Sequence, residues 1–451
     1  MEASSRLPWN KPSVISWIVL FFAALNVIFL GGKRRAFGSF VAEMRRDYIN
    51  ITLTELNWIG DSYAAVGYMT SGLSIAVILF FKRRYGLFQF IGAVWILISC
   101  ITSSLVPNPH WLFLTHTLFH GIGSSLILAV VGLIVNEHFD NSHPYHLLAT
   151  TLISGGSVAS IIFVSLFASL IQTYTWRYAF IILGAMYFVV NGSAGFFFRR
   201  KENHAEISNK KAISCKCREY MSSIRVSLLI LWFIDRVMTS VVTYGLLLNL
   251  TDYMYRTEKN LVKSTILTTL FASGEAITYL IGALITAITK DLFKDKLRYV
   301  LLGTSISMSI FLVLMEFFKQ YVIGSYFLCF LIGFSLGPSI TFLFPAGEEL
   351  TRLSGHVAYP ISLCGMGFGM LVSPLLTAKI AEIFLYKWFF LVQGCLILLK
   401  VTCILIIIII LWFCQNRLDE ENSLQNDSSD EVPVTIPSTD EKKPLINEDE
   451  K

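Results

Sequence analysis

The feature that most limits what this chain can fold into is a series of twelve apolar runs, each long enough to cross a bilayer as a helix. One helical crossing needs about 20 apolar residues. Hydrophobic residues make up 54% of the 451 residues and charged residues only 15%, whereas an ordinary soluble domain carries about 25% charged residues. The sequence therefore excludes a conventional soluble enzyme, a disordered protein and a fibrous repeat, and it predicts an all-α, multi-pass membrane protein.

The twelve runs form two groups of six, separated by a basic polar stretch. We expect membrane helices at residues 14–40, 57–80, 87–106, 111–136, 147–171, 176–198, 226–250, 264–288, 299–317, 321–345, 357–383 and 388–413. The expected organisation is a cytoplasmic N-terminus at 1–13, a six-helix bundle at 14–198, a cytoplasmic linker at 199–225, a second six-helix bundle at 226–413 and a tail at 414–451. From Gln415 onward the tail holds four basic and eleven acidic residues and almost no large apolar side chain, so we expect it to be disordered.

Lysine and arginine are concentrated in loops that alternate along the chain. The loops at 82–84, 199–225 and 290–298, which twelve crossings place on one side of the membrane, carry most of this charge. Because cytoplasmic loops are enriched in lysine and arginine, we expect both termini in the cytoplasm. Anionic lipid headgroups are the natural counter-charge, and nucleic acid is not expected as a partner.

Two short motifs bear on modification and location. Asn50 begins an Asn-Ile-Thr glycosylation sequon in an expected outer loop. In the tail, Glu441, Leu445 and Ile446 fit the acidic dileucine pattern that sorting adaptors read. We expect the plasma membrane as the location, with endosomes or lysosomes as the alternative if the dileucine signal acts.

Several short strings of the sequence are similar to the motifs of a known protein family. Residues 176–184 read Trp-Arg-Tyr-Ala-Phe-Ile-Ile-Leu-Gly, and residues 35–43 read Arg-Ala-Phe-Gly-Ser-Phe-Val-Ala-Glu. Further matches are Trp58-Ile59, Tyr85-Gly86, residues 120–123, Ala149 and residues 155–157. Together with the six-plus-six layout, these strings resemble the monocarboxylate transporter family of the major facilitator superfamily. Of the family's motif at the start of helix 1, only Ser16-Trp17 is present, and residues 140–144 stand where the family has a basic motif before helix 5. The chain is therefore identified as a divergent member.

The resemblance implies where a carboxylate would bind in helix 1. The family uses a lysine late in this helix, and the spacing from Trp17 places that position at Arg35, while the spacing from Trp58 places it at Ala36. An arginine can hold a carboxylate with two hydrogen bonds, but it cannot lose its proton at physiological pH. We therefore expect Arg35 to bind the substrate. The alternative is that residues 33–35 form a basic cluster at the outer membrane interface.

Helix 8 of the family carries an aspartate and, four residues later, an arginine. Here these positions hold Glu275 and Tyr279, so the acid is kept and the base is lost. Glu275 lies mid-span, where a carboxyl is a plausible proton carrier. Arg236 could supply the missing substrate-binding cation, with Asp235 or Glu275 balancing its charge. Structural hydrogen bonds and a buried ion pair are the alternatives for these residues.

His116 and His120 lie four residues apart, on one face of the expected helix 4. Such a pair can relay protons, and His120 is included among the candidate proton-coupling residues. The alternative is that both make polar contacts within the bundle. No third ligand is evident nearby in the sequence, so no metal site is expected.

The expected function is secondary transport of a small monocarboxylate or related organic anion by alternating access, coupled to protons through Glu275, Asp235 or His120. One alternative is a facilitative carrier of a neutral or zwitterionic solute. Another is a non-transporting membrane scaffold or sensor that acts through its acidic tail. No phosphate-loop, nucleophile-elbow or zinc-hydrolase motif occurs in the sequence, so no enzyme activity and no cofactor are expected. Expected partners are the anion, protons, membrane lipids and, as in some family members, a single-span chaperone subunit.

Overall fold

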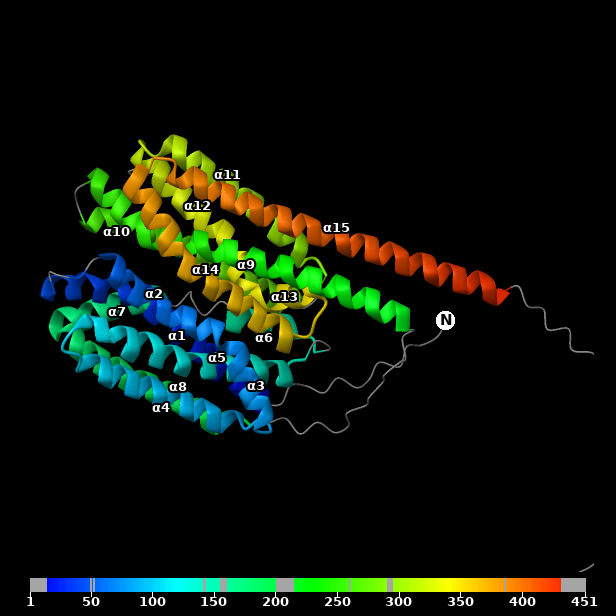
Figure 1. The fold of residues 1–451 in the computed structure, drawn as a ribbon, viewed down its shortest axis with the longest axis horizontal. Helices are drawn as coiled ribbons and strands as arrows, with labels where there is room; N and C mark the ends of the chain where they lie inside the picture. Colours follow the sequence, from blue (N-terminus) through cyan, green and yellow to red (C-terminus); the bar gives the residue numbers. More distant parts are fainter. Residues whose placement is uncertain are drawn as a thin grey trace, which may run out of the picture. The chain divides into compact units, whose positions relative to one another are not determined.

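The computed structural model describes residues 14–48, 51, 53–140, 143–154, 160–199, 215–258, 261–289, 295–384 and 387–430. The regular elements in these ranges are helices, and Figure 1 shows how they are arranged. The α-helices are α1 (Val14–Asp47), α2 (Leu53–Met69), α3 (Ser71–Phe80), α4 (Tyr85–Ser104), α5 (Phe119–His138), α6 (His146–Ser154), α7 (Ser160–Thr173), α8 (Trp176–Phe197), α9 (Cys215–Glu258), α10 (Leu261–Thr289), α11 (Leu297–Phe318), α12 (Val322–Thr341), α13 (Leu343–Thr351), α14 (Gly355–Phe384) and α15 (Phe389–Asp430). A 3₁₀ turn (Pro109–Trp111) and a π-helical turn (Phe113–Leu118) precede α5.

Eleven helical segments within the described residues are long and apolar enough to cross a membrane. They coincide with eleven of the twelve expected spans. The remaining one, expected at 147–171, contains α6 and α7 with residues 155–159 outside the described ranges. The chain is an all-α, multi-pass membrane protein, as the sequence predicts.

Two helices continue well beyond their apolar runs. The seventh span was expected from residue 226, but α9 begins at Cys215 within the expected linker. The tail was expected to be disordered from 414, but α15 continues to Asp430. A helix satisfies its backbone hydrogen bonds internally, and the added segment of α15 contains good helix formers such as Leu418, Glu420 and Glu421. Apolar length therefore sets where a span lies in the membrane, and it does not set where the helix ends.

The tenth expected span, 321–345, is divided into two helices. α12 ends at Thr341, and α13 begins at Leu343 after the non-helical Phe342. Pro345 falls in the first turn of α13, where its missing N–H removes no bond within the helix. The shorter helix α13 carries the two adjacent acids Glu348 and Glu349.

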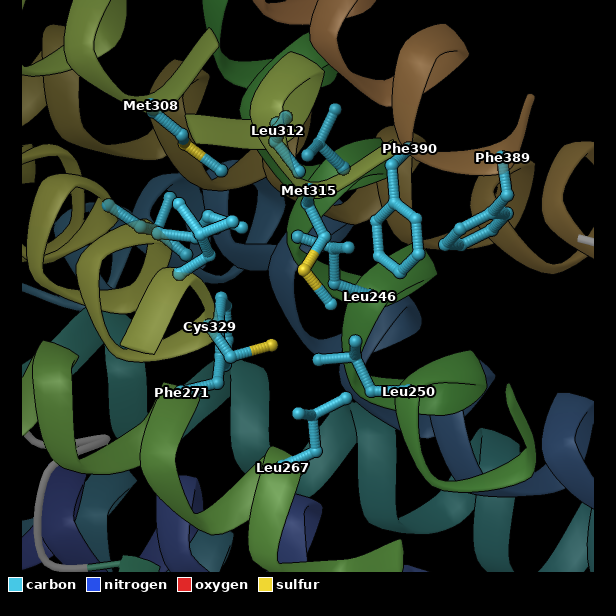
Figure 2. Packing of buried hydrophobic residues seen from close by; sticks show 14 of the residues in the cluster. Leu246, Leu250, Leu267, Phe271, Met308, Leu312, Met315, Cys329, Phe389 and Phe390 are labelled. Carbon is cyan, nitrogen blue, oxygen red and sulfur yellow. The ribbon is translucent and has the colours of Figure 1, made fainter. Parts of the chain in front are cut away.

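The first eight helices pack mainly among themselves, and so do the later ones. α4 packs on α8 and α1 on α7, whereas α9 packs on α14 and α12 on both α10 and α11. Figure 2 shows side chains from α9, α10, α11, α12 and α15 meeting in one apolar core. The main contacts between the halves join α2 to α14, α6 to α10 and α6 to α13. Residues up to Ile407 form one compact unit and those from Ile408 a second, and the site described below lies in the first.

Glycine permits the closest of these helix contacts. A Cβ on Gly333 of α12 would collide with the backbone carbonyl oxygen of Phe271 on α10. Between α4 and α8, a Cβ on Gly86 would lie 2.5 Å from the carbonyl oxygen of Gly195. Both backbones approach so closely only because these residues lack a side chain.

The Trp-Arg string at 176–177 holds one end of the first half together. The indole Nε1 of Trp176 donates to Asp47 Oδ2 at the end of α1 (2.7 Å). The Arg177 guanidinium donates to the Ser104 carbonyl oxygen at the end of α4 (2.7 Å) and to the Tyr48 hydroxyl (2.8 Å). The Trp176-Arg177 pair thus has a structural role at the start of α8.

Candidate functional site

A cavity of about 70 Å³ lies between the two halves of the first unit. Its lining comes from α1, α2, α5 and α6 on one side and from α9, α12, α13 and α14 on the other. The lining is mostly apolar, with hydroxyl groups contributed by Tyr63, Tyr68, Tyr244 and Tyr359 and by three serine or threonine residues. A cavity of this kind can accept a small solute that is apolar over most of its surface.

Arg34 is the charged residue among the described residues that line this cavity. Its Nη1 donates to the hydroxyl of Tyr68 on α2 (3.0 Å). Its guanidinium carbon lies 4.1 Å from the ring centroid of Tyr244 on α9. Arg34 is therefore held by one tyrosine from each half, and this contact bridges the cavity.

No carboxylate of the described residues forms a salt bridge with Arg34. Asp61, which is 8% exposed on α2, interacts with Arg34 electrostatically without such a contact. The Tyr68 bond uses one of the five N–H groups of the guanidinium. Arg34 thus offers a fixed positive charge and further donors to a small anion in the cavity.

The preceding residue, Lys33, points into the interior of the first half and does not line the cavity. Its side chain is fully buried, and its Nζ lies 3.2 Å from His120 Nδ1. The thiol of Cys100 is 4.0 Å from the same Nζ, and the ring centroid of Tyr63 is 5.2 Å away. Tyr63 also lines the cavity, so its side chain lies near both the buried lysine and the cavity.

His116 lies beside this buried pair, as the four-residue spacing predicts. The ring centroids of His116 and His120 are 5.3 Å apart, and the His116 ring stacks on Phe37 at 5.1 Å. Within the described residues, neither nitrogen of His116 has a hydrogen-bond partner, and the same holds for the Tyr63 hydroxyl. We call Lys33, His116, His120 and Tyr63 the Lys33 cluster.

A second buried group of charges lies in the other half. Asp235 and Arg236 are adjacent in α9 and form a fully buried salt bridge with each other, although neighbouring helix residues need not pair. Arg236 Nη1 also donates to the Ser339 carbonyl oxygen (2.8 Å). Lys400 of α15 is fully buried and donates to the Ser339 hydroxyl (2.6 Å). Neither Arg236 nor Asp235 belongs to the cavity lining, so the pair joins helices around Ser339.

Glu275 and Tyr279, the two candidate residues of the eighth expected span, are also not among the residues that line the cavity. The Tyr279 hydroxyl donates to the Leu152 carbonyl oxygen (3.2 Å), which ties α10 to α6 across the two halves. Glu275 is 3% exposed on α10, next to Gly274, at the contact of α10 with α12. Neither residue therefore joins Arg34 in lining the cavity.

Some expected residues cannot be placed. The backbone of Arg35 lies in α1, but its side chain is outside the described residues, as are Asn50, Glu441, Leu445 and Ile446. Two buried lysines, Lys33 and Lys400, are not among the residues that the sequence predicts for the site. Lys400 is the lone charge in the run at 388–413 and could have been flagged as an ionisable residue within a span.

The comparison with known proteins agrees with this architecture. The family model described as Major Facilitator Superfamily matches residues 16–358, which is more than half of the chain. The matched stretch includes Arg34, the Lys33 cluster and all but the first two residues of the first half, and it ends near the start of α14. No curated protein was found to match the chain.

Proposed function

Because the chain belongs to the major facilitator superfamily, whose members are transporters, we propose that it carries a small monocarboxylate or a related organic anion through the cavity between its halves. The observation that carries this proposal is the Arg34 guanidinium, which lines the cavity and forms no salt bridge with any described carboxylate. Alternating access would expose the cavity to each side of the membrane in turn. The resemblance to monocarboxylate transporters supports the same substrate class.

Arg34 takes the role that spacing gave to Arg35. The two are neighbours on α1, and a turn of 3.6 residues rotates each residue by about 100° from the last. Only the Arg34 side chain is described at the cavity. A guanidinium can hold both oxygens of a carboxylate through parallel N–H donors. The tyrosines on either side fix its orientation.

We assign proton coupling to the Lys33 cluster, through Lys33 and His120. These two bases are buried and 3.2 Å apart, and no carboxylate of the described helices forms a salt bridge with Lys33. In such a place one shared proton is tolerated, whereas a second would put two like charges together. The pair can therefore bind and release a single proton.

The closeness of Lys33 and Arg34 provides a physical basis for symport. The two residues are neighbours on α1, and like charges repel more strongly in a buried setting than in water. A positive Arg34 would therefore disfavour a proton on the Lys33 cluster, and an anion bound to Arg34 would reduce this repulsion. Binding of the anion would then strengthen binding of the proton, and linkage makes this effect reciprocal.

Uptake into proteoliposomes tests the substrate assignment. The panel would contain lactate, pyruvate, a ketone body, an aromatic amino acid and creatine. We expect a monocarboxylate to be taken up, Arg34→Gln to abolish its uptake and Arg34→Lys to retain part of it. The exposed Arg84→Gln serves as the matched control. Unchanged anion uptake by Arg34→Gln would refute the assignment, and selective uptake of the zwitterions would replace the proposed substrate class.

The same vesicles with an inward proton gradient test the coupling. Lys33→Gln and His120→Gln should let the anion equilibrate without accumulating above its outside concentration. His110→Gln, at an exposed histidine elsewhere in the first half, should accumulate it like the wild type. Normal accumulation by both Lys33→Gln and His120→Gln would refute this assignment and make Glu275 the candidate proton carrier.

The cellular setting is proposed on the distribution of charge. The basic loops favour cytoplasmic termini, and we propose the plasma membrane as the site of transport. Leu445→Ala/Ile446→Ala should change the distribution between plasma membrane and endosomes if the dileucine motif is read. Co-purification of a single-span protein would identify a chaperone subunit.

A further inference from the structure

A histidine outside the Lys33 cluster joins the two halves where α6 contacts α13 (Figure 1). His146 is the first residue of α6 and precedes the expected span 147–171. Its Nε2 lies 2.7 Å from Oε2 of Glu348 on α13, and the side chains are 12% and 10% exposed. The other ring nitrogen, Nδ1, lies 2.7 Å from the Phe139 carbonyl oxygen.

This contact lies next to the cavity. Phe344, one turn before Glu348 on α13, packs its ring against Tyr359 at 4.8 Å. The backbone N–H of Phe344 donates to the Ser154 hydroxyl (3.3 Å). Both Ser154 and Tyr359 line the cavity. The histidine–glutamate contact therefore belongs to the set of cross-half contacts that closes this end of the cavity.

We propose that His146 is a proton-binding site distinct from the Lys33 cluster, and that a proton bound there holds this end of the cavity closed through Glu348. We call the pair His146 and Glu348 the latch. The proposal adds control of one gate by pH to the proposed transport. It uses neither Arg34 nor Lys33, and its test needs no solute.

The hydrogen bonds of the ring require the extra proton. A neutral imidazole has one N–H and can donate from only one nitrogen, whereas the imidazolium donates from both. Here each ring nitrogen faces an acceptor at 2.7 Å, one a backbone carbonyl and the other a carboxylate. While Glu348 is a carboxylate, only protonated His146 satisfies both contacts.

The charges around His146 act in the same direction. Burial lowers the pKa of the His146 imidazole, but the hydrogen bond and the negative charge of Glu348 outweigh it. The Phe139 carbonyl and the Asp140 carboxylate add to this effect, so the pKa is raised above its ordinary value. The Phe344 ring on α13, whose centroid lies 6.3 Å from that of His146, adds no charge.

The direction of the pH effect follows from this raised pKa. With the latch open, His146 loses Glu348 and its pKa returns toward the ordinary value. The stabilisation of the closed state is therefore complete below the ordinary pKa, and it is lost as the pH rises through the raised pKa. The ratio of closed to open molecules changes tenfold for each pH unit between the two values. Acid on this side favours closure, and alkali favours opening.

Distance measurements between spin labels test the latch in the full chain. An unnatural amino acid that accepts a label would replace Lys82 on one half and Ser354 on the other. Both positions are exposed, and labelling in this way avoids the eight native cysteines. In liposomes without solute, the long-distance population should grow as the pH is raised from about 5.5 to about 8.5, across the ordinary histidine range.

Three latch variants and one control decide the result. His146→Gln and Glu348→Gln should show a mostly open, pH-independent distribution. His146→Lys keeps a charge that can pair with Glu348, so it should stay closed across the range, which a merely unfolded variant cannot do. His110→Gln, whose ring lies 4.0 Å from Glu55 within one half, should titrate like the wild type. A pH-dependent distance that persists in His146→Gln, or a wild type that does not respond to pH, would overturn the proposal.

Discussion

Replacing Tyr244 with leucine tests whether the second half orients Arg34 for its anion. The Arg34 guanidinium carbon lies 4.1 Å from the Tyr244 ring centroid, and Tyr244 is 3% exposed. A desolvated cation–π contact contributes about 1–2 kcal/mol. If this energy keeps Arg34 in its binding orientation, its loss should raise the KM for the anion by about 5- to 30-fold, since 1.4 kcal/mol corresponds to a factor of about ten.

The assay is initial-rate uptake of the transported anion into proteoliposomes over a range of concentrations. Tyr244→Phe is the matched control, because it keeps the ring and removes only the hydroxyl. It should keep a KM close to that of the wild type. Thermal unfolding in detergent would show whether Tyr244→Leu also weakens the apolar cluster that Tyr244 shares with Tyr63 and Met370.

Two results would refute this reasoning. Equal damage by Tyr244→Phe and Tyr244→Leu would place the effect in the hydroxyl rather than in the ring. A normal KM in Tyr244→Leu, with the protein folded, would mean that Tyr68 alone orients Arg34. In that case the contact from the second half would not contribute to binding.

Two further predictions concern the packing that supports the site. Gly333→Ala should lower the free energy of unfolding by about 1–3 kcal/mol, because its Cβ would collide with the Phe271 carbonyl. The control, Gly303→Ala, has open space around the added Cβ and should be neutral or stabilise by up to about 1 kcal/mol. Equal melting temperatures for the two variants would contradict the close contact. Asp235→Asn should lower the free energy of unfolding by about 3–5 kcal/mol, because Arg236 would remain charged and buried without its carboxylate. The double variant Asp235→Asn/Arg236→Gln should recover part of this loss. An unchanged melting temperature in the single variant would show that Asp235 does not stabilise Arg236.

The spans could be predicted closely because each depends on its own segment. A run of about 20 apolar residues must satisfy its backbone within the bilayer, and only a helix does so without partners from elsewhere. Helix ends were less predictable. Phe342 interrupts the tenth span, and α15 continues to Asp430, because a helix can stop within an apolar run or continue into a polar one.

The site depends on rotation and packing, which no single segment contains. The run Lys33-Arg34-Arg35 marks the right turn of α1, but a rotation of about 100° per residue decides which cation enters the cavity and which is buried. His116 and His120 could be paired from their spacing because both lie on one helix. Contact between His120 and Lys33 required α1 and α5 to pack together.

Contacts between residues far apart in the chain could not be predicted from the sequence. His146 and Glu348 are 202 residues apart, and nothing in either segment indicates the other. The sequence alone therefore specified a polytopic helical membrane protein of six plus six spans with ionisable groups near mid-membrane, because hydropathy is local. The packing of the halves decided that Arg34 faces the cavity, that Arg236 is neutralised beside Ser339, and that a histidine–glutamate pair closes one end, because each of these requires separate helices to be brought into contact.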